Sequence, residues 1–153
     1  MKYETRKTII DWKVSAKKEI DPFIKFFILY MCLDAWMSSE SMARTESAKW
    51  KWLNRKDNPL KAHFYSKSQN REPLVGLIQI GKIYDMRPWV EEGKHVSFER
   101  LNSFSQLTDF IYHIRCNLFH GGKNPTSHED KKRVSLAGEI LEDWVSWIIS
   151  HTS

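Results

Sequence analysis

The chain has 153 residues, of which 41% are apolar and 28% charged, with a net charge of +5 and an isoelectric point near 9.2. These values are ordinary for a soluble globular protein and argue against an intrinsically disordered chain. The length suits one domain, which we expect to span residues 1–153 and to bury a core without disulfides or a structural metal. The basic charge makes contact with a polyanion reasonable, although many basic proteins bind no nucleic acid.

The cysteines and the N-terminus bear on the compartment. Cys32 and Cys116 both lie within apolar helical patterns, where a free thiol behaves as a small hydrophobic group. The sequence has no disulfide framework, CxxC spacing or HExxH motif, so neither a metal nor a cofactor is expected. Residues 1–18 are charged throughout and lack the apolar segment of a signal peptide. We therefore expect a cytoplasmic protein without membrane contact.

Two helices are expected in the first forty residues. Residues 5–18 carry apolar side chains at helical spacing. Asp21 followed by Pro22 is a typical helix start, with an N-cap residue and then proline at the first helical position, and it predicts a helix over 23–37. Because residues 26–33 are apolar on every side, this helix should be either central or part of a dimer interface.

The segment 41–56 interleaves basic and aromatic side chains, which suits phosphate contact and base stacking. Lys51 and Arg55 are therefore candidate RNA contacts. Trp50 and Trp52 are two positions apart and face different directions on a helix, so at least one of them should belong to the core. Solvated charge on an amphipathic helix accounts for most of this pattern without any ligand.

The middle of the chain is less clearly patterned. A helix is expected over 60–68, after Pro59. The apolar run 74–84 is compatible with a helix or with a buried strand, and periodicity does not separate the two. Residues 87–100 combine proline, glycine and mixed charge, which indicates a loop.

A second strongly amphipathic helix is expected before two glycines. Gly121 and Gly122 follow the last periodic residue and are a usual way for a helix to end. His120 therefore lies at a helix C-terminus, where the helix dipole favours a protonated imidazole and a nearby arginine. The apolar stripe of this helix consists of Phe104, Leu107, Ile111, Ile114 and Leu118.

The closing helix begins at a capping signal. Ser127 is followed three residues later by Asp130, and apolar residues then recur at three- and four-residue steps. The short connection 121–126 predicts that this helix packs back on the preceding one. Lys123, in that connection, is either a phosphate contact near His120 or a partner of the helix dipole.

Arg115 and His120 form the most informative pair of residues for chemistry. Histidine titrates near neutral pH, as a general acid or base requires, and arginine presents a planar fork of donors to a phosphate. Five helical steps place the two about 140° apart around the axis, so one regular helix does not direct both at one point. Convergence needs a distorted last turn or a second copy of the helix across a symmetric interface. His113, Asn117 and His120 are expected on one polar stripe, with Asn117 as the polar neighbour of His120.

The run Ile114-Arg115-Cys116-Asn117-Leu118-Phe119-His120-Gly121-Gly122-Lys123 resembles the signature of HEPN domains, the all-helical modules of prokaryotic toxins, phage-defence proteins and some eukaryotic nucleases. The segments 85–88 and 21–36 also look like parts of a stand-alone member, so the resemblance covers most of the chain, although only the motif is specific. It implies an all-α helical bundle and favours a helix over 74–84.

The resemblance further implies a metal-independent ribonuclease that acts as a homodimer, in which a 2′-hydroxyl attacks the adjacent phosphate and both protomers contribute to one cleft. By this resemblance His120 is the acid-base group and Arg115 stabilises the transition state. Family members often carry a polar residue directly after the arginine, where this chain has Cys116, so the polar role either passes to Asn117 or is missing. The expected substrate contacts are Lys123, Cys116, His113, Lys51 and Arg55.

Two functional classes remain open at this stage. The first is a dimeric endoribonuclease of a toxin or defence system, with RNA as substrate and an antitoxin or other regulatory protein as a further partner. The second is a non-catalytic helical module that binds RNA, a nucleotide or a protein. Histidine and arginine are also common dipole partners at helix C-termini, and this structural role needs no ligand.

Overall fold

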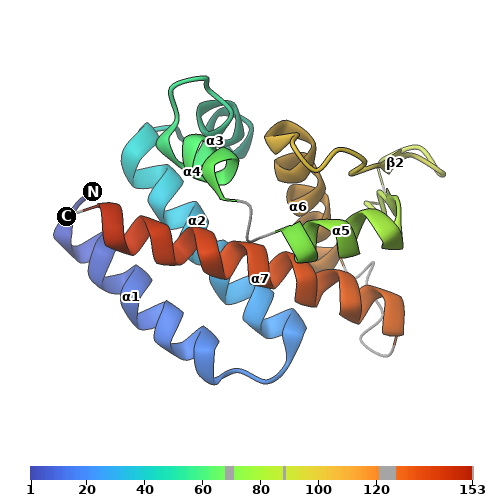
Figure 1. The fold of residues 1–153 in the computed structure, drawn as a ribbon, viewed down its shortest axis with the longest axis horizontal. Helices are drawn as coiled ribbons and strands as arrows, with labels where there is room; N and C mark the ends of the chain where they lie inside the picture. The colour runs from blue at the N-terminus through green and yellow to red at the C-terminus, as the bar shows by residue number, and fades with distance from the viewer. Residues whose placement is uncertain (68–70, 88, 121–126, 153) are drawn as a thin grey trace.

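The computed structural model describes residues 1–67, 71–87, 89–120 and 127–152. Gly121, Gly122 and Lys123 lie outside these ranges, as does the rest of the 121–126 connection. The all-α bundle predicted from the sequence is confirmed for the described residues (Figure 1). Its elements are α1 (Tyr3–Lys18), α2 (Pro22–Ser41), α3 (Glu46–Leu53), α4 (Pro59–Ser66), α5 (Arg71–Ile80), β1 (Ile83–Tyr84), β2 (His95–Val96), α6 (Phe104–Phe119) and α7 (His128–His151).

Helix α2 is the centre of the bundle and contacts α1, α3, α6 and α7. It begins at the expected cap, because Oδ1 of Asp21 accepts a hydrogen bond from the backbone N of Phe23 at 2.9 Å. Its central position explains why its sequence is apolar on every side, whereas Ile24 and Phe27 near its start stay exposed. The buried residues of α2 are Phe26, Leu29, Tyr30, Cys32, Leu33, Trp36 and Met37.

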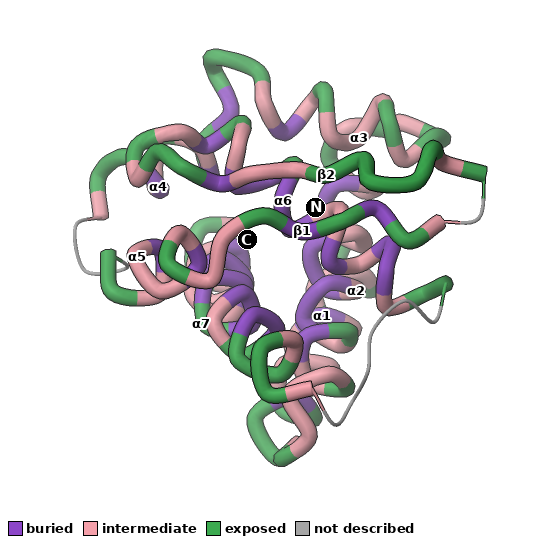
Figure 2. The backbone as a smooth tube through the Cα atoms, turned by 90° about the vertical axis from the view of Figure 1, so that its right-hand side faces the viewer, coloured by how far each residue is buried: buried purple, intermediate pink, exposed green. Residues whose placement is uncertain are grey.

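Helix α7 covers α2 rather than the motif helix. It starts at the expected cap, with the backbone N of Asp130 donating to Oγ of Ser127 at 3.3 Å. Its main partners are α2, α5 and α1, and Figure 2 shows buried residues gathered where α1, α2 and α7 meet. It touches α6 through Phe104 and Trp144, whose ring centres are 5.4 Å apart. The expected packing on α6 is secondary because α2 offers the larger apolar surface.

The two short helices α3 and α4 each begin at a side-chain cap. Oγ1 of Thr45 accepts from the backbone N of Ala48, and Oδ1 of Asn58 accepts from the backbone N of Leu60. Both tryptophans of α3 pack against the core. Trp52 meets Trp36 and Trp50 meets Tyr30, with ring centres 5.0 and 6.2 Å apart.

The ambiguous run 74–84 contains both kinds of structure. Helix α5 ends at Ile80, Gly81 adopts a left-handed φ of 91°, and β1 follows. Strand β1 pairs antiparallel with β2, with Ile83 opposite Val96. The region expected to be a loop thus holds a two-residue strand. Among the described residues, none of the helices has the length and apolar character that a membrane span requires.

Candidate active site at the end of helix α6

His120 closes α6 and is exposed to solvent. Its backbone N donates to the carbonyl oxygen of Cys116 at 3.0 Å, which completes the last turn. The partial negative charge of the helix terminus favours a cation here. The imidazole packs edge-to-face against exposed Trp89, with ring centres 4.8 Å apart. The ring is therefore held on one side by an aromatic neighbour while the residue stays open to solvent.

Arg115 points toward neighbours on α2 and α3. Its Nη1 lies 3.6 Å from Oε2 of Glu46, and its guanidinium carbon lies 5.7 Å from the centre of the Tyr30 ring. Burial is the largest single influence and opposes the charged form, but Glu46, Tyr30 and Cys116 together outweigh it, so the pKa of Arg115 lies above its ordinary value. The hydroxyl of Tyr30 donates to Oε1 of the same carboxylate at 2.7 Å. Glu46 therefore orients a guanidinium that remains 23% exposed.

Phe119 connects the two motif residues. The guanidinium carbon of Arg115 lies 4.8 Å from the centre of its ring, and the ring centres of Phe119 and His120 are 6.1 Å apart. Phe119 is 60% exposed and stacks on Phe27 of α2. Arg115 and His120 thus have different neighbours, as expected from their separation around the helix axis.

Asn117 does not share an open polar stripe with His120, so this expectation from the sequence is wrong. The residue is fully buried. Its Oδ1 accepts from the backbone N of Met86 at 3.0 Å, and its Nδ2 donates to the backbone oxygen of Tyr84 at 2.6 Å. The strand β1 and the residues after it cover this face of α6, and their buried backbone groups need partners. Asn117 is therefore a positioning residue whose amide is already engaged.

A charged cluster lies on the same face of α6. The guanidinium of Arg87 donates two hydrogen bonds to the carboxylate of Asp85, from Nη2 to Oδ2 at 2.6 Å and from Nε to Oδ1 at 2.9 Å. Hydrogen bonding by Arg87 outweighs burial and holds the pKa of Asp85 below its usual value. Nε2 of His113 lies 3.6 Å from Oδ2 of Asp85, and its Nδ1 lies 2.8 Å from the carbonyl oxygen of Asp109. His113 belongs to this cluster, with only 13% of its side chain exposed.

Arg87 also links the cluster to the motif, because its guanidinium carbon lies 5.9 Å from the ring of Trp89, the neighbour of His120. Residues 85–88 are part of the resemblance, but the predicted site residues do not include Asp85 or Arg87. A usable signal was present. In extended backbone, residues two apart lie on one side, so an aspartate and an arginine at this spacing are placed to pair.

The remaining residues expected to contact the substrate differ in their exposure. Cys116 is 2% exposed, so its thiol does not reach the surface and the expectation of substrate contact is wrong for it. The apolar packing of α6 buries this position. Lys51 is exposed and lines a groove of about 580 Å³ between α3 and α6. The side chain of Arg55 is 61% exposed and pairs with Asp57 at 3.2 Å. Lys123 lies outside the described residues.

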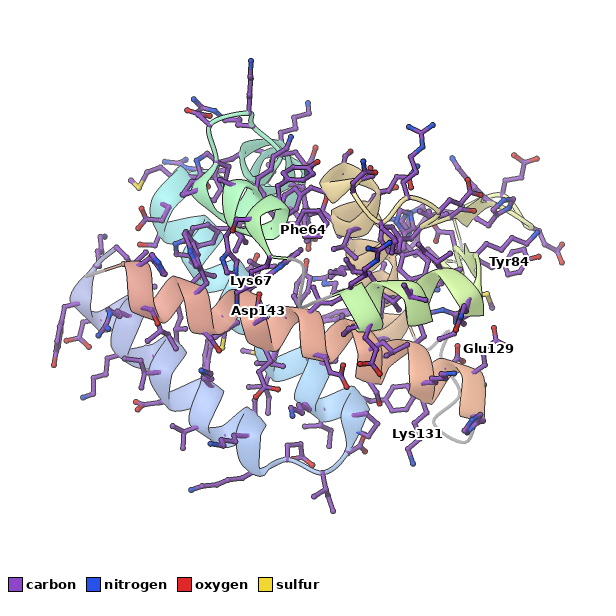
Figure 3. All side chains as sticks on the ribbon, in the orientation of Figure 1. Phe64, Lys67, Tyr84, Glu129, Lys131 and Asp143 are labelled. Carbon is purple, nitrogen blue, oxygen red and sulfur yellow. The ribbon has the colours of Figure 1, made fainter. Side chains whose placement is uncertain are left out.

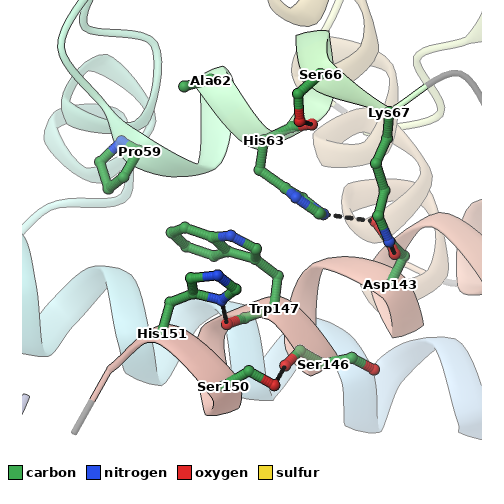
Figure 4. Close-up of a pocket in the computed structure, with 10 residues that line it drawn as sticks. All are labelled: Pro59, Ala62, His63, Ser66, Lys67, Asp143, Ser146, Trp147, Ser150 and His151. Atoms are coloured by element: carbon green, nitrogen blue, oxygen red, sulfur yellow. Dashed lines mark hydrogen bonds and ion pairs between the residues drawn. The ribbon is translucent and has the colours of Figure 1, made fainter.

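A second polar cluster joins α4 to α7, where Lys67 and Asp143 lie together (Figure 3). Nε2 of His63 lies 3.0 Å from Oδ2 of Asp143, and Nζ of Lys67 lies 2.6 Å from its Oδ1. The ring of Trp147 stacks with His63 and also with His151, at 5.5 and 4.8 Å between ring centres. These side chains line a hollow of about 590 Å³ (Figure 4). We interpret this cluster as a connection between helices, since its charges are paired with one another.

No group of three or more histidine, cysteine, aspartate or glutamate side chains among the described residues is placed to hold a metal ion. Comparison of the chain with protein-family models, with curated proteins and with solved structures gives no match.

Proposed function

We propose that the protein is a metal-independent, HEPN-like endoribonuclease with an active site formed by two copies of the chain. The observation that carries this proposal is the end of α6, where His120 is exposed and Phe119 separates it from Arg115, whose guanidinium is oriented by Glu46. A titratable base and a fixed cation at one end of one helix suit acid-base chemistry on a phosphodiester.

The reaction needs a proton taken from one oxygen and a proton given to another. When a 2′-hydroxyl attacks its neighbouring phosphate, a base removes the hydroxyl proton and an acid protonates the departing 5′-oxygen. The P–O bond to the 5′-oxygen breaks as the new P–O bond forms, which leaves a 2′,3′-cyclic phosphate and a 5′-hydroxyl. The attacking and leaving oxygens lie on opposite sides of the phosphorus, so two imidazoles serve this geometry better than one. Two copies of His120, related by a two-fold axis, would supply both.

An apolar surface beside the motif supports a second copy as the partner. Ile20, Ile24 and Phe27 recur at four- and three-residue steps and are 96%, 48% and 37% exposed. Phe27 stacks on Phe119, which itself contacts Arg115. Exposed apolar side chains grouped in this way are typical of an interface. A two-fold axis near Phe119 would bring the ends of two α6 helices together and would add the second Arg115 and His120 to one cleft.

The test is cleavage of a labelled single-stranded RNA by purified protein in EDTA. We expect cleavage products that end in a cyclic phosphate, and we expect His120→Ala to lower the rate by a factor of about 100 or more. The matched control is His151→Ala, since His151 is also exposed at the end of a helix, α7, but belongs to the second polar cluster. Cleavage that persists in His120→Ala, or that requires an added metal, would overturn the assignment.

A non-catalytic RNA-, nucleotide- or protein-binding module is the second candidate. The observation that favours it is the pairing of the arginines with acidic side chains. Arg115 pairs with Glu46, and Arg87 pairs with Asp85. Each guanidinium is thus partly neutralised before a phosphate arrives. This candidate predicts salt-dependent RNA binding with the RNA intact after long incubation. If the apolar surface around Phe27 binds a different protein, such as an antitoxin, the purified chain would be monomeric.

A further inference from the structure

The groove between α3 and α6 is a hollow separate from the His120 end of α6. Its volume of about 580 Å³ lies in the range typical of sites for small organic ligands. One wall comes from α3 and the other from the first half of α6. The lining residues are Ser47, Trp50, Lys51, Asn54, Ser105, Gln106, Thr108, Asp109 and Tyr112.

The aromatic part of the groove is held in place by packing. The rings of Trp50 and Tyr112 face each other at 5.8 Å between centres with a 58° tilt, and Trp50 also packs on Tyr30 of α2. Nδ2 of Asn54 donates to the backbone oxygen of Trp50 and to Oγ1 of Thr108, each at 3.0 Å. The wall is therefore formed before any ligand arrives, and it offers the aromatic surface on which single-stranded bases stack.

The charged part of the groove contains the carboxylate of Asp109. The side chain of Asp109 is 56% exposed and offers two carboxylate oxygens that only accept hydrogen bonds, with Nδ1 of His113 3.6 Å from its Oδ1. Guanine presents two adjacent N–H donors, N1–H and the N2 amino group, which match a carboxylate in bidentate fashion. Adenine and cytosine place a ring nitrogen acceptor beside their amino group, and uracil flanks its one N–H with two carbonyl oxygens. Each of those three bases would direct an acceptor toward the carboxylate.

The position of the groove relative to His120 suits one continuous strand of RNA. His120 follows Asp109 by eleven positions, which corresponds to about 16 Å along the helix and a difference of about 20° around its axis. His113 lies between them on that face and contacts Asp85, which pairs with Arg87. The exposed cation Lys51 lies across the groove on α3, where it would meet the backbone phosphates of a bound strand. A strand of a few nucleotides is long enough for this span and would pass over Asp85 and Arg87, which cover this face of α6.

We propose that the groove between α3 and α6 binds an unpaired guanine of the RNA, with Asp109 pairing with N1–H and N2, the rings of Trp50 and Tyr112 supporting the base, and Lys51 contacting a phosphate. The inference rests on the proposed function for RNA as the ligand. It adds a base preference at a fixed distance from the cleavage site.

The test measures binding without cleavage. Protein carrying His120→Ala is titrated in EDTA into fluorescent uridine oligonucleotides that contain one central guanosine, inosine or adenosine, and anisotropy is recorded. We expect guanosine to bind about tenfold more tightly than adenosine, with inosine between them because it lacks the N2 amino group. Adding Asp109→Asn should abolish the difference between guanosine and adenosine. Asp11→Asn, an equivalent change at an exposed position on α1, should leave it intact.

A second variant blocks the groove while it keeps the carboxylate. Ser105 is exposed and lines the groove, so Ser105→Trp fills the hollow without entering the core, and it should also abolish the guanosine preference. Equal binding of the three oligonucleotides, no binding at all, or a preference that survives both Asp109→Asn and Ser105→Trp would overturn the inference. If the unmodified protein cleaves RNA in EDTA without any such preference, the groove assignment fails alone. If the preference is present but the unmodified protein cleaves nothing, the nuclease proposal fails alone.

Discussion

Histidines with charged neighbours occur in two regions of this molecule, and the two regions use them differently. Between α4 and α7, His63 and Lys67 share Asp143, and the side chains of His63 and Asp143 are 10% and 16% exposed. At the end of α6, His120 is exposed and contacts aromatic rings, while Arg115 lies beyond Phe119. Charges that are paired and shielded connect helices, whereas the imidazole of His120 is open to solvent, as the proposed reaction requires.

Matched substitutions in the two regions should separate their roles most clearly. Arg115→Ala should lower the rate of RNA cleavage by a factor of about 100 or more, because one donor to the developing phosphate charge is lost. The cleavage rate of Arg115→Lys should fall between those of the unmodified chain and Arg115→Ala, since lysine keeps the charge but lacks the planar fork of donors. His63→Ala should leave the cleavage rate unchanged and lower the melting temperature. Initial rates in EDTA and thermal unfolding of the same preparations test this, and the comparison breaks if His63→Ala slows cleavage as much as Arg115→Ala.

Asn117 should affect stability although it lies within the motif. Asn117→Leu leaves the backbone N of Met86 and the backbone oxygen of Tyr84 without their partner. Buried groups in this condition cost about 2 kcal/mol, which should appear as a lower free energy of unfolding in urea. Asn102→Leu, a change at an exposed position, is the control. A loss similar to that of the control would show that the residues after β1 are not held by this amide.

The stability that Asp85 contributes should depend on pH. Arg87 holds the pKa of Asp85 below its ordinary value of about 3.9. The stabilisation from the ionised carboxylate is therefore fully present above the ordinary value and is lost as the pH falls through the lower, folded-state value. Asp85→Asn should be less stable than the unmodified chain at pH 7, and the difference should shrink below about pH 4. Urea unfolding at both pH values measures this, and a constant difference would contradict the ion pair.

Local signals in the sequence predicted the helices well, and contacts between distant segments account for what they missed. The cap at Asp21 and the apolar circumference of α2 follow from residues close in the chain, as does the position of His120 at the end of α6. The pairing of Arg115 with Glu46 and the burial of Asn117 depend on segments about 70 and 30 positions away, which no helical period reveals. The groove beside Asp109 likewise exists only once α3 lies against α6.

The shared active site is tested most directly by diluting active chains with inactive ones. Unmodified and His120→Ala protein are mixed in several ratios, unfolded and refolded together, and assayed for RNA cleavage in EDTA at constant total protein. If one cleft needs His120 from both copies, only dimers of two unmodified chains cleave, and activity falls with the square of the unmodified fraction, to about a quarter in an equal mixture. Activity that falls in direct proportion to that fraction would contradict the composite site.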